Sequence, residues 1–496
     1  MKLFKFILGK VLGGLFAIAA MVMLVGVWKL QMLPTTLVVL VGVVLALVTA
    51  LVIVLTWSGR GKVWMTIGIV LAVIGIAVLS VGSFFVWQTV NALNDFNAGE
   101  TETVLVGGYM RADDERSLAA DLKFGVLTTD DRQAIDSAIQ KLNKEFKAEI
   151  SCTEYETPVA LLEALLKSEL DAILLNQAYL DVLGDIPGYE EKLTKIREVF
   201  RHNVEIEVQK EENKPGVEDP DQTYTSLKDS FAVYISGIDA RGGKVSIKSR
   251  SDVNIVAVVN PKTRQVLLVS TPRDYYVPIS SPQAYLDGKK DKLTHAGLGG
   301  PNASRETLSN LYGIDISYYF KVNFSGFVEI VDALDGITVH SDFNFRSTAD
   351  DGTVYYYQKG DNQLDGNAAL AFCRNRYSFA DGDNQRGKNQ MLVIKAVIDK
   401  AMSPKLLTKY TQILDAVSGS MEMTVPTDVI GDLVSRQLSE GGSWNVVSYS
   451  VTGSGGYEKS PAAGGAEAYM MHPNKDSVER AKQLIQDVVD GKTVTP

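Results

Sequence analysis

The stretch "VNIVAVVNPKTRQVLLVSTP", residues 253–272, decides the fold class of this chain. It contains two apolar runs rich in Val, Ile and Leu, and the polar segment "NPKTR" lies between them. Short apolar runs separated by a few turn-forming residues predict the two strands of a hairpin. The preceding run "FAVYISGID", 231–239, also predicts a buried strand. We therefore expect a sheet at the centre of this region.

The segments after this hairpin alternate between helical and strand-like patterns. Polar starts followed by apolar residues at helical spacing predict helices, and short apolar runs predict strands. The predicted helices are 302–313, 325–334, 364–374, 384–402 and 477–489, and the predicted strands are 317–324 and 336–340. This order favours a mixed sheet covered by helices. The Gly-rich stretch "TGSGGYEKSPAAGGAEAYM", 452–470, predicts a flexible loop.

A smaller α/β region precedes the sheet. Strand-like runs at 102–108, 122–129, 148–155 and 171–177 alternate with helical patterns at 128–146 and 158–170. Repeated β-α-β units predict a small parallel layer, which resembles half of a periplasmic-binding-type module. The charged stretch 208–225 contains Pro, Gly and many acidic residues, and it predicts a linker.

The first part of the chain is apolar and has no carboxylate before Asp95. Three uncharged runs, 11–28, 30–59 and 63–94, are each long enough to cross a bilayer. Tryptophans stand at the ends of these runs, where the indole ring prefers the membrane interface. A cleaved signal peptide is the alternative for the first run, but two further spans follow it and no small-residue cleavage site is evident. We predict three domains: a membrane anchor at 1–94, an accessory α/β domain with linker at 95–225, and a main domain at 226–496.

Basic residues beside the spans predict the orientation. Because positive charges favour the cytoplasmic side, we expect the N-terminus inside the cell. The residues on that side are Lys2, Lys5, Lys10, Arg60 and Lys62, against Lys29 alone on the other. Three crossings then place residues 95–496 outside the cytoplasm, as part of a multi-pass protein of the cell membrane.

Composition excludes several classes of function. The chain has 59 Asp and Glu against 49 Lys and Arg, and this acidic balance argues against a nucleic-acid partner. Four scattered histidines show no zinc-binding spacing. The two cysteines, Cys152 and Cys373, form no metal motif, and we expect free buried thiols. A disulfide between them remains an alternative outside the cell.

The stretch "AFCRNRYSFADGDNQRGKNQ", 371–390, concentrates positive charge in this acidic chain. Arg374 and Arg376 are two residues apart, so on an extended segment they point to one side. Arg386 and Gln390 are four apart and share one helix face, and Asp383 can pair with Arg386. Guanidinium groups suit bidentate contact with phosphate oxygens. A solvated surface patch is the alternative for this segment alone.

Polar residues at predicted strand ends add to this cluster. Arg273 follows a strand directly, whereas Asp239 ends one strand and Arg250 and Asp252 precede the next. Two carboxylates at adjacent strand ends can hold Mg²⁺, which completes its octahedron with phosphate and water. Each residue also has a simpler interpretation as a turn-forming or strand-capping side chain.

Residues 229–400 contain a series of ordered motifs. They are "GID", "SRSDVNIVAVVNPKTRQVLLVSTPRDYYV", "KLTHAGLGG", "YYFKVNFSGFVEIVDALDGITV", "KGDNQLDGNAALAFCRNRY" and "DNQRGKNQMLVIKAV". With these motifs the chain resembles the LytR-CpsA-Psr family of cell-envelope proteins. The three spans and the accessory domain are similar to the capsule-associated members from streptococci.

The resemblance implies a fold and a function. The expected fold is α/β (α+β), with a mixed central sheet flanked by helices, a small α/β accessory domain and three transmembrane helices. The implied enzyme is a Mg²⁺-dependent phosphotransferase that moves a capsular or teichoic-acid-type glycopolymer from a polyprenyl-pyrophosphate carrier to peptidoglycan. Its partners are therefore the lipid-linked polymer, the peptidoglycan acceptor and the membrane.

The resemblance also assigns roles to residues. Asp239 and Asp252 would hold Mg²⁺, and Asp383 would orient Arg386. Catalysis would involve Arg273, Arg374, Arg376 and Asp383, and the pyrophosphate would be bound by Arg250, Arg273, Arg374, Arg376, Arg386 and Gln390. A polyprenyl chain also needs an apolar pocket, which Phe324, Phe327, Ile330, Val393 and Val397 could line unless they are ordinary core.

Two other functions are compatible with the same residues. A pyrophosphatase acting on the lipid carrier would use the same clamp and would differ only in its acceptor, which is water. A membrane-anchored sensor or regulator would bind an envelope ligand through the accessory domain.

Overall fold

The structure is a computed structural model. It describes residues 2–30, 35–57, 62–96, 101–128, 132–207, 230–238, 249–281, 286–349, 351–379, 382–403 and 421–495. The chain divides into two compact units. One contains the three N-terminal helices and α13 (Thr427–Glu440), and the other contains the sheets described below.

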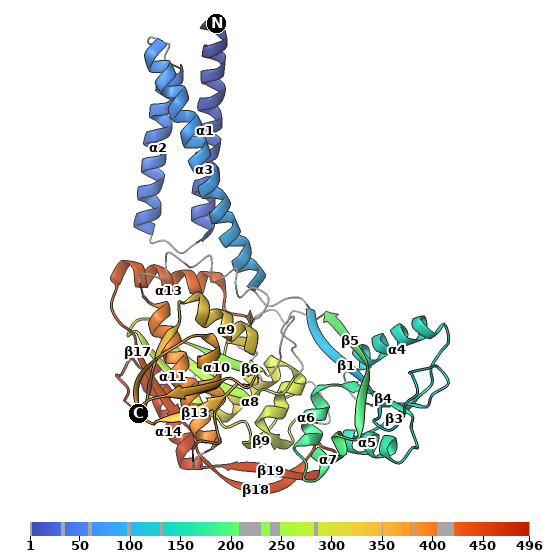
Figure 1. Cartoon of the computed structure of the whole chain (residues 1–496). Coiled ribbons are helices and arrows are strands. Elements are labelled where there is room, and N and C mark those ends of the chain that lie inside the picture. Colours follow the sequence, from blue (N-terminus) through green and yellow to red (C-terminus); the bar gives the residue numbers. More distant parts are fainter. Residues whose placement is uncertain are drawn as a thin grey trace. The chain divides into compact units, whose positions relative to one another are not determined.

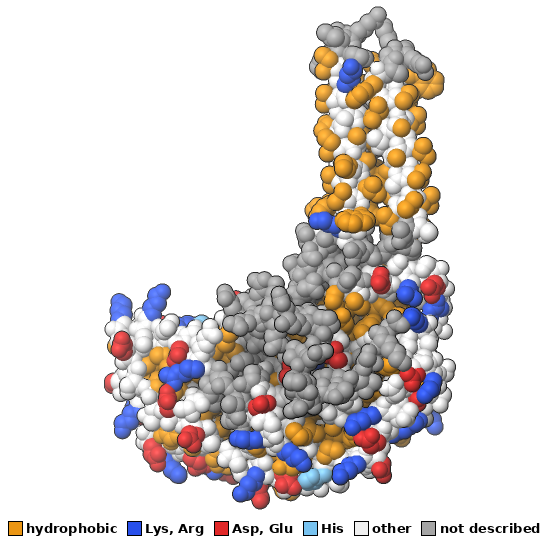
Figure 2. Space-filling model, turned by 180° about the vertical axis from the view of Figure 1, so that it is seen from behind, with side chains coloured by type: hydrophobic (Ala, Val, Ile, Leu, Met, Phe, Trp, Pro, Cys, Tyr) orange, Lys and Arg blue, Asp and Glu red, His pale blue; other side chains and the backbone are white. Residues whose placement is uncertain are grey.

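Three long helices, α1 (Lys2–Leu30), α2 (Thr35–Trp57) and α3 (Lys62–Phe96), confirm the three predicted apolar segments. Within the described residues, the stretches long and apolar enough to cross a membrane are Ile7–Lys29, Thr36–Trp57 and Val63–Gln88. Figure 2 shows hydrophobic side chains over most of their described surface, whereas charged side chains are scattered over the sheet-containing unit. An apolar outer surface of this kind is suited to lipid rather than to water.

The accessory layer is a five-stranded sheet in the described residues, with the order β3-β2-β4-β1-β5. Its strands are β1 (Thr101–Arg111), β2 (Phe124–Leu127), β3 (Cys152–Tyr155), β4 (Ala172–Asn176) and β5 (Ile196–Glu207). β2 is parallel to β3 and β4, but β1 is antiparallel to β4 and β5. The prediction of a parallel layer is therefore confirmed for β2, β3 and β4 but wrong for β1. No helix crosses between β1 and β2, so the chain returns in the opposite direction.

Four helices lie between β2 and β5 in the chain: α4 (Arg132–Phe146), α5 (Pro158–Leu166), α6 (Ala178–Gly184) and α7 (Tyr189–Leu193). The predicted helices at 128–146 and 158–170 correspond to α4 and α5. α5 starts where the Thr157 side chain accepts a hydrogen bond from the amide of Ala160 and Pro158 occupies the first turn. The predicted linker 208–225 lies outside the described residues.

The larger sheet has six strands in the described residues, in the order β16-β11-β6-β7-β8-β17. They are β6 (Phe231–Ile238), β7 (Val253–Asn260), β8 (Gln265–Ser270), β11 (Tyr318–Asn323), β16 (Met421–Met423) and β17 (Asn445–Ser450). β7 and β8 form the predicted hairpin, whereas β6 with β11 and β8 with β17 are parallel pairs. The prediction of a mixed sheet is confirmed.

Helices cover both faces of this sheet (Figure 1). On one face, Val256 and Leu267 share a buried core with α8 (Pro301–Tyr312) and α14 (Lys475–Val489). On the other face, Ile255 and Leu268 pack with Met391 of α11 (Asp383–Ala401). Successive residues point to opposite faces of a strand, so both faces of the central strands are apolar. The first core also includes residues of α5 and α6 from the accessory layer.

Smaller elements complete the unit. They are β9 (Tyr276–Pro278), β10 (Lys290–Lys292), the 3₁₀ helix η1 (Leu293–Gly299), α9 (Phe324–Ala333), β12 (Ile337–Ser341), β13 (Phe345–Thr348), β14 (Val354–Tyr357), β15 (Gly360–Leu364), α10 (Gly366–Arg374), β18 (Gly453–Ser460) and β19 (Ala466–Pro473).

The predicted loop at 452–470 is instead the β18–β19 hairpin. Its turn is tied to a buried carboxylate, because Ser460 Oγ and the amide of Ala462 donate hydrogen bonds of 2.9 and 2.8 Å to Asp291. This anchor lies 169 residues away in sequence, so composition alone could not reveal it.

Both cysteines are free thiols, as predicted, but each is half-buried rather than buried. Burial raises the pKa of Cys152 to about 11 and that of Cys373 to about 12. Neither thiol is therefore poised to act as a thiolate nucleophile near neutral pH.

Candidate functional site

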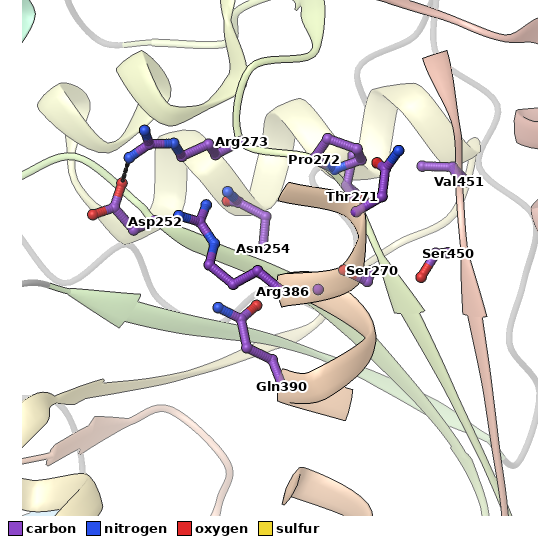
Figure 3. A pocket seen from close by; sticks show the side chains of 12 residues that line it. Asp252, Asn254, Ser270, Thr271, Pro272, Arg273, Arg386, Gln390, Ser450 and Val451 are labelled. Atoms are coloured by element: carbon purple, nitrogen blue, oxygen red, sulfur yellow. Dashed lines mark hydrogen bonds and ion pairs between the residues drawn. The ribbon is translucent and has the colours of Figure 1, made fainter. Parts of the chain in front are cut away.

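A polar pocket lies at one edge of the six-stranded sheet (Figure 3). β7 begins at this edge, and β8 and β17 end there, because β7 runs antiparallel to β8 while β17 runs parallel to it. The first turns of α11 close the pocket. It encloses about 310 Å³, counting the part open to solvent, and is lined by Asp252, Asn254, Ser270, Thr271, Pro272, Arg273, Asn384, Arg386, Gly387, Gln390, Ser450 and Val451.

Asp252 and Arg273 form an ion pair in this pocket, with 2.8 Å between Arg273 Nη1 and Asp252 Oδ1. Asp252 precedes β7 and Arg273 follows β8, so the antiparallel pairing of these strands brings the two residues together. Arg273 Nε also lies 3.9 Å from Asp274. Both members of the pair are mostly buried, at 17% exposure for Arg273 and 22% for Asp252. The guanidinium is thus held with one side against a carboxylate.

Arg386 and Gln390 lie one turn apart on α11 and both line the pocket, as their spacing predicts. Figure 3 shows Arg386 pointing from the helix toward Asp252 and Asn254, with the Gln390 amide beside it. Gly387 lets the helix approach the end of β8, since a Cβ there would lie 2.8 Å from Ser270 Oγ. Because Arg386 directly precedes Gly387, its long side chain lies where α11 comes close to the sheet edge.

A buried hydrogen-bond network supports the segment that carries Asp252. Asn254 Oδ1 accepts bonds of 2.9 Å from the Tyr234 hydroxyl and 3.0 Å from Ser251 Oγ. Asn254 Nδ2 donates to the Ser251 carbonyl at 2.9 Å. Burial raises the pKa of Tyr234, so its hydroxyl stays protonated as a donor. Buried hydrogen bonds restrain the residues that they join, and these restrain Ser251, the residue before Asp252.

Arg374 and Arg376 do not line the pocket. Arg374 ends α10 and its guanidinium stacks on the Phe324 ring, with 4.6 Å to the ring centroid. Arg376 stacks on its neighbour Tyr377, with 4.7 Å to that centroid. α10 is tied to α11 because Asn389 Nδ2 donates to the Phe372 carbonyl at 3.3 Å. That the two arginines clamp one pyrophosphate stays a prediction.

Arg250 also lies outside the pocket lining and contacts the accessory layer. Its Nη1 is 3.2 Å from Asp185 Oδ1, and its Nε is 3.7 Å from Asp181 Oδ2. Arg250, which the sequence predicts to bind pyrophosphate, is therefore paired with carboxylates of the accessory layer. That Arg250 binds phosphate stays a prediction.

The residues predicted to line a lipid pocket are divided between two helices. Phe324, Phe327 and Ile330 of α9 are half-buried, whereas on α11 Val393 is fully buried and Val397 half-buried. The contact between Phe324 and Arg374 places the apolar start of α9 next to one predicted clamp residue. A lipid pocket at this place stays a prediction.

The predicted Mg²⁺ site falls only partly within the described residues. Asp239 and the side chain of Asp383 lie outside them, so the pairs Asp239–Asp252 and Asp383–Arg386 stay predictions. Within the described residues no three His, Cys, Asp or Glu side chains gather as a metal-binding group. Mg²⁺ usually takes one or two carboxylates and fills its other positions with phosphate and water. The Asp252 carboxylate at a polar pocket fits an ion bound together with phosphate.

Comparison with known proteins identifies the family of this chain. The model of the LytR_cpsA_psr family matches residues 195–485, which is more than half of the sequence. The chain belongs to the LytR-CpsA-Psr family.

The relatives include proteins named polyisoprenyl-teichoic acid–peptidoglycan teichoic acid transferase TagU. The protein from Enterococcus faecalis is 37% identical over 208 residues, which is 42% of this chain and 65% of that protein. The match thus spans just under two thirds of its length. The protein from Bacillus mycoides is 33% identical over 244 residues, which is 47% of this chain and 76% of that protein.

The chain is also similar to solved structures, among them those of TagV and TagT. B. subtilis TagV shares 28% identity over 54% of this chain and 99% of its own, with a TM-score of 0.43. TagT bound to LI-WTA shares 28% identity over 56% of this chain and 96% of its own, with a TM-score of 0.41.

Several residues near the pocket were not predicted as site residues from the sequence. Asn254 and Asn384 contribute amides to the lining, and Asp185 and Lys292 form an ion pair of 2.7 Å that adjoins Arg250. Lys292 belongs to the motif "KLTHAGLGG", so this motif could have identified it as a site residue from the sequence. Asp185 lies in a part of the chain that carries none of the quoted family motifs, so only the tertiary contact reveals it.

Proposed function

We propose that this protein transfers a glycopolymer from a polyprenyl-pyrophosphate carrier to peptidoglycan. The observation that carries the proposal is the convergence of Asp252, Arg273, Arg386 and Gln390 on one polar pocket at the sheet edge (Figure 3). These residues come from two separate motifs of the family, at 249–277 and 383–397. The names of the two relatives support the same chemistry, because both are teichoic acid transferases that act on a polyisoprenyl-linked polymer and peptidoglycan.

The side chains suit phosphoryl transfer, which mainly requires positioning and neutralisation of charge. A hydroxyl of the acceptor would attack the phosphorus next to the sugar, and the bond from this phosphorus to the prenyl phosphate would break. The leaving prenyl phosphate would take up the negative charge, and the proton of the hydroxyl would pass to a base that we do not assign. Arg273 and Arg386 would bind the phosphate oxygens through their guanidinium groups.

Asp252, with Asp239, would hold Mg²⁺, which when bound would neutralise the phosphate oxygens. The chain's own contribution is to orient Arg273 by the Asp252 carboxylate and to orient Arg386 by the approach of α11 to β8. Arg374 and Arg376 would close on the outer phosphate from the end of α10, and Gln390 would donate from α11.

The proposed location follows from the three apolar helices and the positions of the basic residues. With the N-terminus in the cytoplasm, residues 95–496 would face the cell wall, where both the lipid carrier and peptidoglycan are found. The three helices would keep the site close to a carrier that cannot leave the bilayer.

The deciding experiment supplies the full-length protein in proteoliposomes with a lipid-linked glycopolymer, Mg²⁺ and a peptidoglycan acceptor. A covalent polymer–peptidoglycan adduct, formed together with polyprenyl phosphate, is the expected result. Release of polymer phosphate without adduct would instead identify a pyrophosphatase. No turnover of the lipid-linked polymer would overturn both enzymatic functions and favour an envelope sensor.

A further inference from the structure

We propose that Asp185, a carboxylate of the accessory layer, positions Arg250 and Lys292 beside the phosphate site. The accessory layer would then be part of the machinery that binds pyrophosphate. This inference rests on the proposed function, and it concerns a residue outside all the family motifs quoted above.

The first support is the geometry of Asp185. It follows the last residue of α6, and its two carboxylate oxygens contact two cations of the other layer. Oδ2 lies 2.7 Å from Lys292 Nζ, and Oδ1 lies 3.2 Å from Arg250 Nη1. One carboxylate thus holds two basic side chains at fixed positions.

The second support is burial. Lys292 is 4% exposed, Arg250 15% and Asp185 19%, so these charges are largely removed from water. Burial alone would raise the pKa of Asp185, but Lys292 and Arg250 outweigh it and the pKa is lowered. Removing one partner of such a buried group leaves the others uncompensated.

The third support is the short route from these cations to the pocket. Lys292 Nζ lies 3.5 Å from Asp274, the residue after Arg273, and Arg250 stands two residues before Asp252. Each cation held by Asp185 therefore adjoins one member of the Arg273–Asp252 ion pair. A displacement of Asp185 can therefore move Arg273 through Lys292 and Asp274, and Asp252 through Arg250.

Backbone contacts of η1 make this route stiff. The amide of Ser251 donates to the Thr294 carbonyl at 3.2 Å, and the Thr294 amide donates to the Arg273 carbonyl at 2.9 Å. Gly297 lies against the same segment, since a Cβ there would be 2.3 Å from the Ser249 carbonyl oxygen. Displacement of Lys292, which directly precedes η1, is therefore transmitted to both segments that carry the ion pair.

If Asp185 only stabilised the fold, the loss of another paired carboxylate of the accessory layer should weaken binding equally. Glu163 is a matched control for this alternative. Glu163 forms an ion pair of 2.5 Å with Lys192 and accepts a hydrogen bond from the Tyr189 hydroxyl at 3.1 Å. All three residues lie within the accessory layer. Glu163→Gln therefore weakens the layer by a comparable change of charge without touching Arg250 or Lys292.

The test measures binding of farnesyl pyrophosphate with Mg²⁺ to the full-length protein in detergent micelles by titration calorimetry. We expect Asp185→Asn to weaken binding about tenfold, since hydrogen bonds to charged groups contribute about 1.5–3 kcal/mol and 1.4 kcal/mol is a factor of ten. Glu163→Gln should stay within about twofold of the wild type. Asp185→Glu keeps the charge and should recover most of the affinity.

A double variant tests whether Asp185 acts through Arg250. We expect the loss of binding in Asp185→Asn combined with Arg250→Gln to be clearly smaller than the sum of the two single losses, because neighbouring residues that act as a unit are not additive. Additive losses in the double variant would overturn this route.

The remaining outcomes are distinct. A wild type that binds no farnesyl pyrophosphate would overturn the proposed function together with the inference. Unchanged binding by Asp185→Asn, or equal losses in Asp185→Asn and Glu163→Gln, would overturn the inference alone. If Asp185→Asn does not fold, Asp185→Glu decides: a loss as large as that of Arg250→Gln would contradict a role that depends on the carboxylate charge.

Discussion

At the scale of single residues, the pocket depends on pairs of opposite charge that restrain long side chains. Arg273 has several rotatable bonds, and its contact with Asp252 at 2.8 Å selects one arrangement of them. A guanidinium restrained in this way loses less conformational freedom when it binds an anion. The same residue type on the protein surface would lack this advantage.

Arg273→Lys should lower the rate of polymer transfer by about 10- to 100-fold. The ammonium keeps the charge but cannot contact Asp252 and a phosphate with a planar fork, and a hydrogen bond to a charged group contributes about 1.5–3 kcal/mol. The measurement is the initial transfer rate of the full-length protein in proteoliposomes. Arg116→Lys is the matched control, because Arg116 is bonded to Asp114 and Asp171 within the accessory layer. An equal fall in this control would contradict the assignment.

At the scale of elements, η1 and the strand ends form one support for the site. η1 contains Gly297, whose missing side chain allows contact with the backbone of residues 249–251. The hydrogen bonds of Thr294 join this turn to the segments before β7 and after β8. The motif "KLTHAGLGG" is therefore a scaffold for the residues that line the pocket.

Gly297→Ala should destabilise the fold by about 1–3 kcal/mol, the usual cost of forcing atoms into a packed interior. Its Cβ would lie 2.3 Å from the Ser249 carbonyl oxygen and 2.8 Å from the Ser251 amide nitrogen, and backbone atoms cannot rotate away. Urea unfolding followed by near-ultraviolet circular dichroism measures the change. In Gly184→Ala the new methyl meets only Leu193 Cδ1 at 3.6 Å, so this control should keep the wild-type stability.

Two largely buried carboxylates, Asp185 and Asp291, should also make the fold sensitive to acid. Burial acts to raise the pKa of Asp185 and of Asp291, but Lys292 and Arg250 around the first and His295 around the second lower both values. A carboxylate with a lowered folded pKa stabilises the fold above its unfolded value of 3.8 and loses this contribution as the pH falls further.

We therefore expect the free energy of unfolding to decrease as the pH falls below about 4, and to decrease less steeply in Asp185→Asn. Urea unfolding at a series of pH values gives both slopes. Asp113→Asn alters a carboxylate that is 84% exposed, and it should keep the wild-type slope. A slope for Asp185→Asn as steep as that of the wild type would show that folding does not lower the pKa of Asp185.

At the scale of the whole molecule, the orientation of the three apolar helices decides which substrates the pocket can meet. We predict that a membrane-impermeant maleimide labels Glu149→Cys on intact cells but labels Ser58→Cys only after the membrane is opened. Both changes are made in a Cys152→Ser and Cys373→Ser background. Glu149 is an exposed residue of the accessory layer, and position 58 lies between the second and third apolar helices. The reverse labelling pattern would invert the proposed topology.

Local patterns were sufficient for most of the described helices, but many of the described strands, among them β5 and β17, were not predicted. The β7–β8 hairpin was predictable because its turn residues lie between two apolar runs, and Asn260 indeed accepts hydrogen bonds from the amides of Lys262 and Thr263. The spacing of Arg386 and Gln390 likewise predicted their common face on α11. These features depend on residues within a few positions of each other.

Local sequence patterns were therefore enough to predict the apolar helices, the mixed sheet and the strand ends near Asp252 and Arg273. The fold was needed to show that β1 runs antiparallel, that residues 452–470 form a hairpin and that Arg250 pairs with Asp185. The physical reason is range: strand periodicity and turn chemistry act between neighbours. A buried carboxylate instead selects partners far along the chain by their position in the folded core, which leaves no periodic signal.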